Sequence, residues 1–328
     1  MSIFVGDVEL SAPLILAPMS GVTDLPFRNL VKRLGAGMVV SEMIASEAMI
    51  RENRRTLLMA ANRPEEYPMA VQLAGCEPKT MAEAARLNAD RGACVIDINM
   101  GCPAKKVVNG YAGSALMRDE SAAARIIEAT VNAVDLPVTL KMRTGWDDDS
   151  RNAPSLARIA ENAGVKMISI HGRTRCQMYR GRSDWRFIRK VKEAVSIPVV
   201  ANGDVVTLDD AKRILEDSRA DALMVGRGTY GKPWFINQII EFLETGTKPR
   251  EPSLQTKFEL LSEHYEAMLS HYGNESGVRV ARKHLSWYTK GLAGSAALRS
   301  RLNRLDTAKA VKAVLSDFFS ARIWGAVA

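Results

Sequence analysis

The chain has 328 residues, of which 47% are hydrophobic and 25% are charged, and its formal net charge at pH 7 is +8. This composition is typical of a globular protein with a sizeable core, and the length allows one large domain or two smaller ones. The sequence has no run of 18 apolar residues and does not open on a basic stretch followed by a long apolar one. These two features exclude a membrane-spanning helix and argue against a secretory signal.

The cysteines are scattered, and no two of them form a CxxC pair. This pattern argues against a zinc site or a disulfide framework and favours a reducing compartment. We therefore expect a cytoplasmic protein without a metal, and nothing in the sequence implies a protein partner.

Short apolar runs alternate with amphipathic segments through the first 245 residues. Each run has four to six residues, the length of a strand that is buried on both faces. The runs are residues 14–17, 38–41, 69–74, 95–99, 138–141, 167–171, 199–202 and 222–226. Helical segments such as 80–90, 121–134 and 208–216 lie between them, and another, 234–243, follows the last run. Eight strand–helix units in this length predict an α/β protein with a (β/α)8 TIM barrel, because a doubly wound sheet usually has about five or six strands.

The chain changes character after residue 245, where a proline-containing hinge, GTKPREPS, begins. No strand-like run follows it, and segments 255–272, 278–290 and 295–305 have helical patterns. We expect Asp306 to cap a last helix that ends at about residue 319. Between Ser276 and Lys312 there are nine basic residues and one acidic residue. The sequence therefore predicts a barrel domain at 1–245 and a small all-helical domain at 246–328 whose basic face binds a polyanion.

In (β/α)8 enzymes the reactive groups lie where the strands end and the following loops begin. All eight predicted strands end in polar or backbone-presenting groups, namely Pro18, Met19, Ser20, Glu42, Gln72, Asn99 to Cys102, Lys141, Arg143, His171, Arg173, Asn202, Gly203, Asp204, Gly226 and Arg227. Polar residues are also favourable at strand ends for a structural reason, since strand ends emerge into water. Their convergence on one rim nevertheless favours a functional site.

The loops after the seventh and eighth strands carry glycines, at the position where barrels commonly bind a phosphate through backbone N–H groups. Arg227 is expected to add a cationic contact to this phosphate. Gly226, Gly228 and Gly231 also spell G-x-G-x-x-G, but no strand follows them. A phosphate-binding loop is therefore favoured over a dinucleotide fingerprint.

Three side chains at the strand ends are candidates for chemistry. Lys141 ends the fifth strand, where an enclosed amine is either a Schiff-base nucleophile or a fixed positive charge beside a developing anion. His171 ends the sixth strand and is either structural or a ligand contact. Cys102 follows the fourth strand on a loop constrained by glycine and proline, beside Lys105 and Lys106, where a thiol can donate a proton or act as a nucleophile.

The segment 96–114, IDINMGCPAKKVVNGYAGS, resembles the signature of the tRNA-dihydrouridine synthases, and the overall pattern is most similar to their bacterial DusB branch. Further matching segments are APMSGVTDLPFR (17–28), VQLAG (71–75), LKMRTGW (140–146), IHGRTR (170–175), ANGDV (201–205) and MVGRG (224–228). The match runs through the whole predicted barrel. The C-terminal segment resembles the RNA-binding domain of this family in length and charge.

This resemblance implies an FMN-dependent oxidoreductase that reduces the C5=C6 bond of a uridine in the D-loop of tRNA. FMN would lie over the barrel mouth, held by Pro18, Met19, Ser20, Gln72, Lys141, His171, Asn202, Gly203, Asp204, Gly226 and Arg227. Hydride would pass from the reduced flavin to C6 and a proton from Cys102 to C5, and NADPH would reduce the flavin again. In this interpretation Lys141 stabilises the anionic reduced flavin, which replaces the Schiff-base role.

The target uridine would have to leave the RNA stack to meet the flavin, and Asn99 is expected to hold the uracil by its hydrogen-bonding edge. The other residues expected to contact tRNA are Lys105, Lys106, Arg173 and Arg175 near the mouth and Arg279, Arg282 and Lys283 in the helical domain.

Three alternatives remain. The first is a flavin-dependent oxidoreductase of free pyrimidines, which the basic C-terminal segment disfavours. The second is a non-catalytic RNA-binding protein on a degenerate barrel, which the presence of Cys102, Lys141 and His171 disfavours. The third is an aldolase that uses Lys141, which leaves Cys102 and the phosphate loops without a role.

Overall fold

The computed structural model describes residues 3–52 and 54–323, and its larger part is a closed barrel of eight parallel strands. The barrel strands are β3 (Leu14–Leu16), β4 (Met38–Val40), β6 (Met69–Ala74), β7 (Val95–Met100), β8 (Val138–Arg143), β9 (Met167–His171), β10 (Val199–Asn202) and β11 (Ala222–Val225). Neighbouring strands pair in sequence order from β6 to β11, β11 pairs with β3, β3 pairs with β4, and β4 pairs with β6 and closes the ring. The predicted (β/α)8 fold is therefore confirmed, and each predicted apolar run forms one of its strands.

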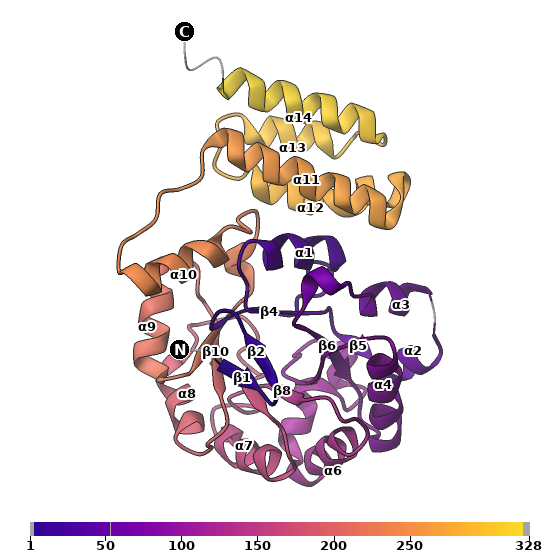
Figure 1. The fold of residues 1–328 in the computed structure, drawn as a ribbon, viewed down its shortest axis with the longest axis vertical. Coiled ribbons are helices and arrows are strands. Elements are labelled where there is room, and N and C mark those ends of the chain that lie inside the picture. Colours follow the sequence, from indigo (N-terminus) through magenta and orange to yellow (C-terminus); the bar gives the residue numbers. More distant parts are fainter. Residues whose placement is uncertain (1–2, 53, 324–328) are drawn as a thin grey trace.

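Helices cover the outside of the barrel (Figure 1). They are α1 (Leu25–Arg33), α2 (Ser46–Ile50), α3 (Arg54–Ala60), α4 (Pro78–Asp90), α6 (Glu120–Val131), α7 (Ala153–Asn162), α8 (Trp185–Lys192), α9 (Leu208–Ser218) and α10 (Phe235–Thr245). The short helix α5 (Lys105–Val108) follows β7 at the mouth of the barrel and buries none of its residues. Three 3-10 turns complete the layer, at Pro64–Glu66, Gly113–Arg118 and Arg227–Thr229.

A short hairpin that the sequence did not predict closes the amino-terminal end of the barrel. It consists of β1 (Ile3–Val5) and β2 (Val8–Leu10), which pair antiparallel. Its buried side chains share a core with the inward-facing side chains Ile15, Val95 and Val200 of the barrel strands. A further two-residue strand, β5 (Ile44–Ala45), pairs with β6 at the opposite end.

Each barrel strand alternates between the interior of the barrel and the layer of helices, as the pleat of a strand requires. On β7, Ile96 and Ile98 pack in the core under the helices, whereas Val95 belongs to the interior core. Asp97 and Asn99 continue the interior face of the same strand. The interior therefore changes from apolar to polar toward the carboxyl ends of the strands, which places the polar groups at one mouth.

The C-terminal bundle consists of α11 (Leu254–Tyr272), α12 (Asn274–Tyr288), α13 (Ser295–Leu302) and α14 (Ala308–Ile323), and it has a hydrophobic core of its own. It lies beside α1 and α10 (Figure 1). The barrel's last helix ends at Thr245 and α11 begins at Leu254, on either side of the predicted hinge. The predicted cap of α14 is wrong by one residue, because Ala310 N donates to the hydroxyl of Thr307 while Asp306 accepts from Arg282.

Aromatic contacts join the bundle to the barrel. Phe27 on α1 lies 5.3 Å from His264 and 5.6 Å from His284, measured between ring centroids. The rings of Tyr230 and Trp287 stack at 4.0 Å. None of the helices formed by residues 3–52 and 54–323 is long and apolar enough to cross a membrane.

Candidate active site

A cavity of about 650 Å³ lies at the mouth of the barrel, where the carboxyl ends of the strands meet. It brings together nearly all of the residues predicted to form the site, namely Pro18, Met19, Ser20, Gln72, Asn99, Cys102, Lys141, His171, Asn202, Gly203, Asp204, Gly226 and Arg227. Its size is that of a pocket that encloses a cofactor or a substrate. The convergence expected from the strand ends is therefore present in three dimensions.

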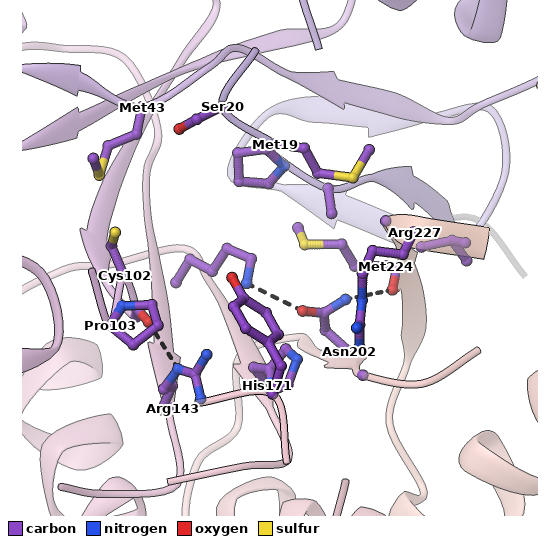
Figure 2. Close-up of a pocket in the computed structure, with 18 of the residues that line it drawn as sticks. Met19, Ser20, Met43, Cys102, Pro103, Arg143, His171, Asn202, Met224 and Arg227 are labelled. Atoms are coloured by element: carbon purple, nitrogen blue, oxygen red, sulfur yellow. Dashed lines mark hydrogen bonds between the residues drawn. The ribbon is translucent and has the colours of Figure 1, made fainter. Parts of the chain in front are cut away.

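Lys141 lies in the floor of this cavity and is held by an amide. Its ammonium donates to Asn202 Oδ1 at 3.1 Å, and Asn202 Nδ2 donates in turn to the carbonyl of Met224 at 2.8 Å (Figure 2). Burial lowers the pKa of Lys141 to about 8, and the charge of Asp97 opposes this shift. An ammonium so poorly solvated is stabilised by any anion that enters the cavity.

His171 lies at the end of β9 among several cations. Burial, followed by the charges of Lys141, Arg143, Arg173 and Arg227, holds the pKa of His171 well below its usual range. Its imidazole is therefore neutral at pH 7. The Nδ1 atom of His171 is buried and has no hydrogen-bond partner among the described residues. A buried polar atom of this kind is normally paired, so it is available to a bound ligand.

The loops after β10 and β11 form the cationic end of the cavity. Asp204 accepts two hydrogen bonds from Arg173, at 2.7 and 2.6 Å, and one from Arg227 at 3.1 Å. Burial by itself raises the pKa of Asp204, but the hydrogen bonds and positive charges of these partners lower this pKa below its usual value. Gly203 has a φ of +126°, and a Cβ there would meet Ser183 Oγ at 2.3 Å, so this turn requires glycine.

Cys102 lies on the opposite side of the cavity from Asn202 and Arg227 (Figure 2). Its N–H donates to Asn99 Oδ1 at 2.9 Å, and its carbonyl accepts from the hydroxyl of Ser114 at 2.8 Å. Gly113 has a φ of +61°, and a Cβ there would meet the Cys102 carbonyl oxygen at 2.8 Å. The loop is thus fixed on both sides, and the thiol is held at the wall of the cavity.

Comparison with known proteins assigns the family. The family model for dihydrouridine synthase (Dus) matches residues 15–323. The chain belongs to the dihydrouridine synthase family.

Relatives of this family match along nearly the whole chain. A probable tRNA-dihydrouridine synthase from Rickettsia bellii is 56% identical over 97% of this chain and 98% of its own length. A tRNA-dihydrouridine synthase B from Xanthomonas campestris is 49% identical over 98% of this chain and 97% of its own. Among solved structures, a morphinone reductase variant in complex with tetrahydroNAD has a TM-score of 0.56 at 14% identity, covering 78% of this chain and 93% of that one. This last likeness supports the barrel fold alone.

Arg173, which was predicted to contact RNA, is paired within the protein in this structure. Its side chain is only 3% exposed, and its guanidinium donates to Asp204 and to the carbonyls of Arg180 and Gly181. These contacts support the loop after β10, and a contact of Arg173 with RNA stays a prediction. Arg175 is half-buried and lies 4.7 Å from the ring of Trp146.

The other residues predicted to contact RNA differ in their availability. Lys105 and Lys106 are exposed on α5, directly after the Cys102 loop. On α12, Arg279 pairs with Glu275, a neighbour one turn away. Arg282 donates to Asp306 and to the carbonyl of Leu305. Lys283 donates to the carbonyl of Gly21 in the loop that lines the cavity.

Two residues of the site were missed by sequence reasoning. Tyr179 is 56% exposed at the cavity and lies 5.1 Å from the guanidinium of Arg227 and 5.6 Å from that of Arg143, measured from its ring centroid. Arg143 also donates to the carbonyls of Gly101 and Thr174 and so ties the Cys102 loop to the loop after β9. Arg143 was noted at a strand end, but no sequence signal gave it a role; Tyr179 lies in a loop without a motif.

A second cavity of about 1050 Å³ lies between the barrel mouth and the C-terminal bundle. Ser20 and Met43 line both cavities, which are therefore adjacent. Lys106 lines it from α5, and Lys283 lines it from α12. Among residues 3–52 and 54–323, no group of three or more histidine, cysteine or acidic side chains is arranged to hold a metal ion.

Proposed function

We propose that this protein is a tRNA-dihydrouridine synthase that reduces the C5=C6 bond of a uridine in the D-loop of tRNA, with FMN as its bound cofactor and NADPH as the source of electrons. The observation that carries the proposal is that Cys102 and Arg227 lie on opposite sides of one cavity, which the buried amine of Lys141 also lines. Family membership and relatives that match over their full length support it.

The residues of the cavity fit an FMN molecule. FMN carries a phosphate and, when reduced, an anionic ring, and both need positive charge. Arg227 and the glycine-bearing loops after β10 and β11 suit the phosphate, and Lys141 suits the ring. The unpaired Nδ1 of His171 offers a further polar contact. Pro18, Met19, Ser20, Gln72, Asn202, Gly203, Asp204 and Gly226 complete the proposed cofactor site.

FMN bound in this cavity supplies the hydride that reduces C6 of the uracil ring. Cys102 then acts as the general acid: its S–H bond breaks, the proton adds to C5, and the thiolate is protonated again from solvent. Asn99 orients the base, because its side chain lies beside the Cys102 loop and lines the cavity. Lys141 keeps its proton and stabilises negative charge in the cavity.

The position of the C-terminal bundle suits a tRNA substrate. A target base must leave its stack to reach a cavity at the barrel mouth, and the second cavity offers space for the neighbouring nucleotides. The exposed side chains Lys105 and Lys106 lie at the same mouth and suit contacts with phosphates. A tRNA substrate also suits a cytoplasmic enzyme.

Mass mapping of dihydrouridine in tRNA tests the proposal directly, with RNA taken from cells that contain or lack this protein. We expect one D-loop position to lose its two-dalton mass increase in the deletion strain and to regain it when the gene is restored. Purified protein should be yellow and should form dihydrouridine from unmodified tRNA and NADPH. Unchanged tRNA in the deletion strain, together with reduction of free uracil by the purified protein, would support the pyrimidine oxidoreductase instead.

A further inference from the structure

One helix of the C-terminal bundle, α12, contacts two loops that line the cavity at the barrel mouth. This helix lies on the side of the bundle that faces the barrel (Figure 1). The first loop is the β3 loop (residues 17–23), which leads from β3 to the cap of α1, and the second is the β11 loop (residues 226–234), which leads from β11 to α10. Each loop contributes at least three residues to the lining of the cavity, whereas α12, which the structure describes throughout, lines none of it. The helix therefore reaches the proposed cofactor site through these two loops.

At the β3 loop, a side chain of α12 holds the backbone of Gly21. The ammonium of Lys283 donates to the carbonyl of Gly21, and the N–H of Gly21 donates to Glu42 Oε1 in the barrel. Glu42 is buried, and Gly21 has a φ of +74°, with space for a Cβ only 3.2 Å from Lys283 Nζ. The loop is thus held from both sides, directly after Ser20, which lines the cavity.

At the β11 loop, the end of α12 packs against two consecutive residues. The rings of Trp287 and Tyr230 stack with their centroids 4.0 Å apart and their planes at 9° to each other. Gly231 has a φ of +69°, and a Cβ there would lie 2.3 Å from the carbonyl carbon of Trp287 and 2.7 Å from Tyr288 N. Only glycine allows so close an approach of two backbones. The last glycine of the G-x-G-x-x-G pattern is therefore explained by the packing of α12.

These contacts affect how far the cavity is formed before a ligand enters it. Loops at a barrel mouth are more mobile than the strands they follow, and a ligand that needs them in one arrangement binds with an affinity reduced by the fraction of molecules that have this arrangement. Lys283 and Trp287 are four positions apart on α12, so they lie on one face of the helix. That face contacts both loops at once, and α12 couples their positions.

We propose that Lys283 and Trp287 are positioning residues that hold the β3 and β11 loops in the arrangement that binds FMN, so that the C-terminal bundle takes part in flavin binding as well as in the proposed contact with RNA. The inference rests on the proposed function. It gives Lys283 a second role beside its predicted contact with tRNA.

Titrations of the full-length protein, freed of flavin, with FMN and with riboflavin test the proposal, and flavin fluorescence is the readout. Riboflavin has no phosphate and is uncharged, so its affinity is insensitive to the attraction between a cation and the FMN phosphate. We expect Lys283→Met to raise Kd about tenfold for both flavins, because the β3 loop loses a charged hydrogen-bond donor. We expect Trp287→Leu to raise Kd for FMN about fivefold, because the β11 loop loses its stacked ring.

Two further variants separate positioning from a general loss of structure. Trp287→Phe keeps a ring over Tyr230 and should bind FMN within about twofold of the wild type. Lys290→Met is the matched control for Lys283→Met: Lys290 lies two residues after α12, and its exposed side chain has no hydrogen bond or ion pair within the described part of the chain. Its removal should leave both affinities unchanged. Circular dichroism at the temperature of the titration verifies that each variant is folded, and Lys283→Met, which changes no core residue, decides the proposal if Trp287→Leu does not fold.

The outcomes are distinct for the inference and for the proposed function. The proposal is overturned if Lys283→Met binds both flavins as tightly as the wild type does. It is also overturned if Lys283→Met weakens the binding of FMN but not of riboflavin, since that result would be an effect of charge alone. The titrations use neither tRNA nor NADPH. A wild-type protein that binds no FMN would contradict the proposed function, whereas variants that match a flavin-binding wild type would contradict only the positioning role.

Discussion

The Tyr272 hydroxyl, at the end of α11 in the C-terminal bundle, donates a 2.9 Å hydrogen bond to the carboxylate of Asp24 in the barrel. The same carboxylate caps α1 by accepting from Phe27 N at 3.0 Å. Asp24 follows the loop that begins at Pro18 and lines the cavity at the barrel mouth, and Lys283 of the bundle donates a hydrogen bond to the carbonyl of Gly21 in this loop. The bundle therefore contacts the segment that shapes the site.

Removing this hydroxyl should loosen the contact between the two parts. We expect Tyr272→Phe to lower the free energy of unfolding by about 1–2 kcal/mol, because Asp24 is buried and loses a partner. Urea denaturation measures the difference. Tyr265→Phe is the matched control: its hydroxyl is buried without a hydrogen-bond partner among the described residues, so its removal should cost nothing. Equal losses in the two variants would show that the Asp24 contact does not stabilise the protein.

The fold could be predicted from the sequence because a parallel strand buried on both faces is a continuous apolar run, and eight such runs appear at regular spacing. Most of the cavity at the barrel mouth followed from the same pattern, since the carboxyl ends of barrel strands meet at one mouth. The β1–β2 hairpin was missed because each of its strands has three residues. The equally short β3 and β4 are buried on both faces, whereas β1 and β2 alternate buried and exposed residues over too few positions for a period to be detected.

The contacts that the sequence could not predict join distant parts of the chain. Arg173 is a basic residue beside a predicted site, and only the fold reveals that Asp204, 31 positions later, neutralises it. Lys283 and Gly21 are 262 positions apart. Asp97 lies inside an apolar strand, where the sequence shows a polar residue but not the Gln72 amide on the neighbouring strand that donates to it.

The Cys102 thiol should be required for the reaction but not for the cofactor. We expect Cys102→Ala to retain flavin and to lose dihydrouridine formation by about 10²–10⁴-fold, because a general acid contributes a factor of that size. Flavin absorbance and nucleoside mass analysis measure the two effects. Cys94→Ala is the control. Cys94 lies just before β7, at the end of this strand that is opposite to Cys102, and among the described residues its thiol hydrogen-bonds with the backbone of Met69. Wild-type turnover by Cys102→Ala would assign the proton to another donor.

Flavin binding should weaken at alkaline pH because of Lys141. Its pKa in the free protein is about 8, and a bound anion would raise it, so binding favours the protonated amine. The affinity for FMN should therefore fall as pH rises above about 8, by at most about tenfold per pH unit. Fluorescence quenching titrations between about pH 7 and pH 9.5 measure this slope. Lys141→Met should bind FMN more weakly with little dependence on pH in this range, and a steep slope in this variant would assign the proton to a different group.

The buried histidines His264 and His284 should make the bundle sensitive to acid. Each is 1% exposed, and their ring centroids lie 4.7 Å apart. Burial lowers the pKa of His264 to about 3, and burial together with the charges of His264 and Lys283 lowers the pKa of His284 well below its usual range. In the unfolded chain both titrate near pH 6.5, so between about pH 3 and 6.5 the unfolded state binds more protons. Their stabilising contribution is thus complete above about pH 6.5 and is lost as pH falls.

A variant separates the loss of stability that the histidines cause in acid from the gain of stability that the buried carboxyl groups cause. Burial raises the pKa of Asp24 and of Glu42, so acid favours the folded state through these two groups. His284→Phe keeps a ring beside Phe27 but cannot take up a proton. We expect the loss of unfolding free energy between about pH 7.5 and pH 5 to be smaller in this variant than in the wild type by about 2 kcal/mol, as measured by urea denaturation at the two pH values. An identical loss in both proteins would mean that the pKa of His284 is the same in the folded protein as in the unfolded chain, and that acid destabilises the bundle through other groups.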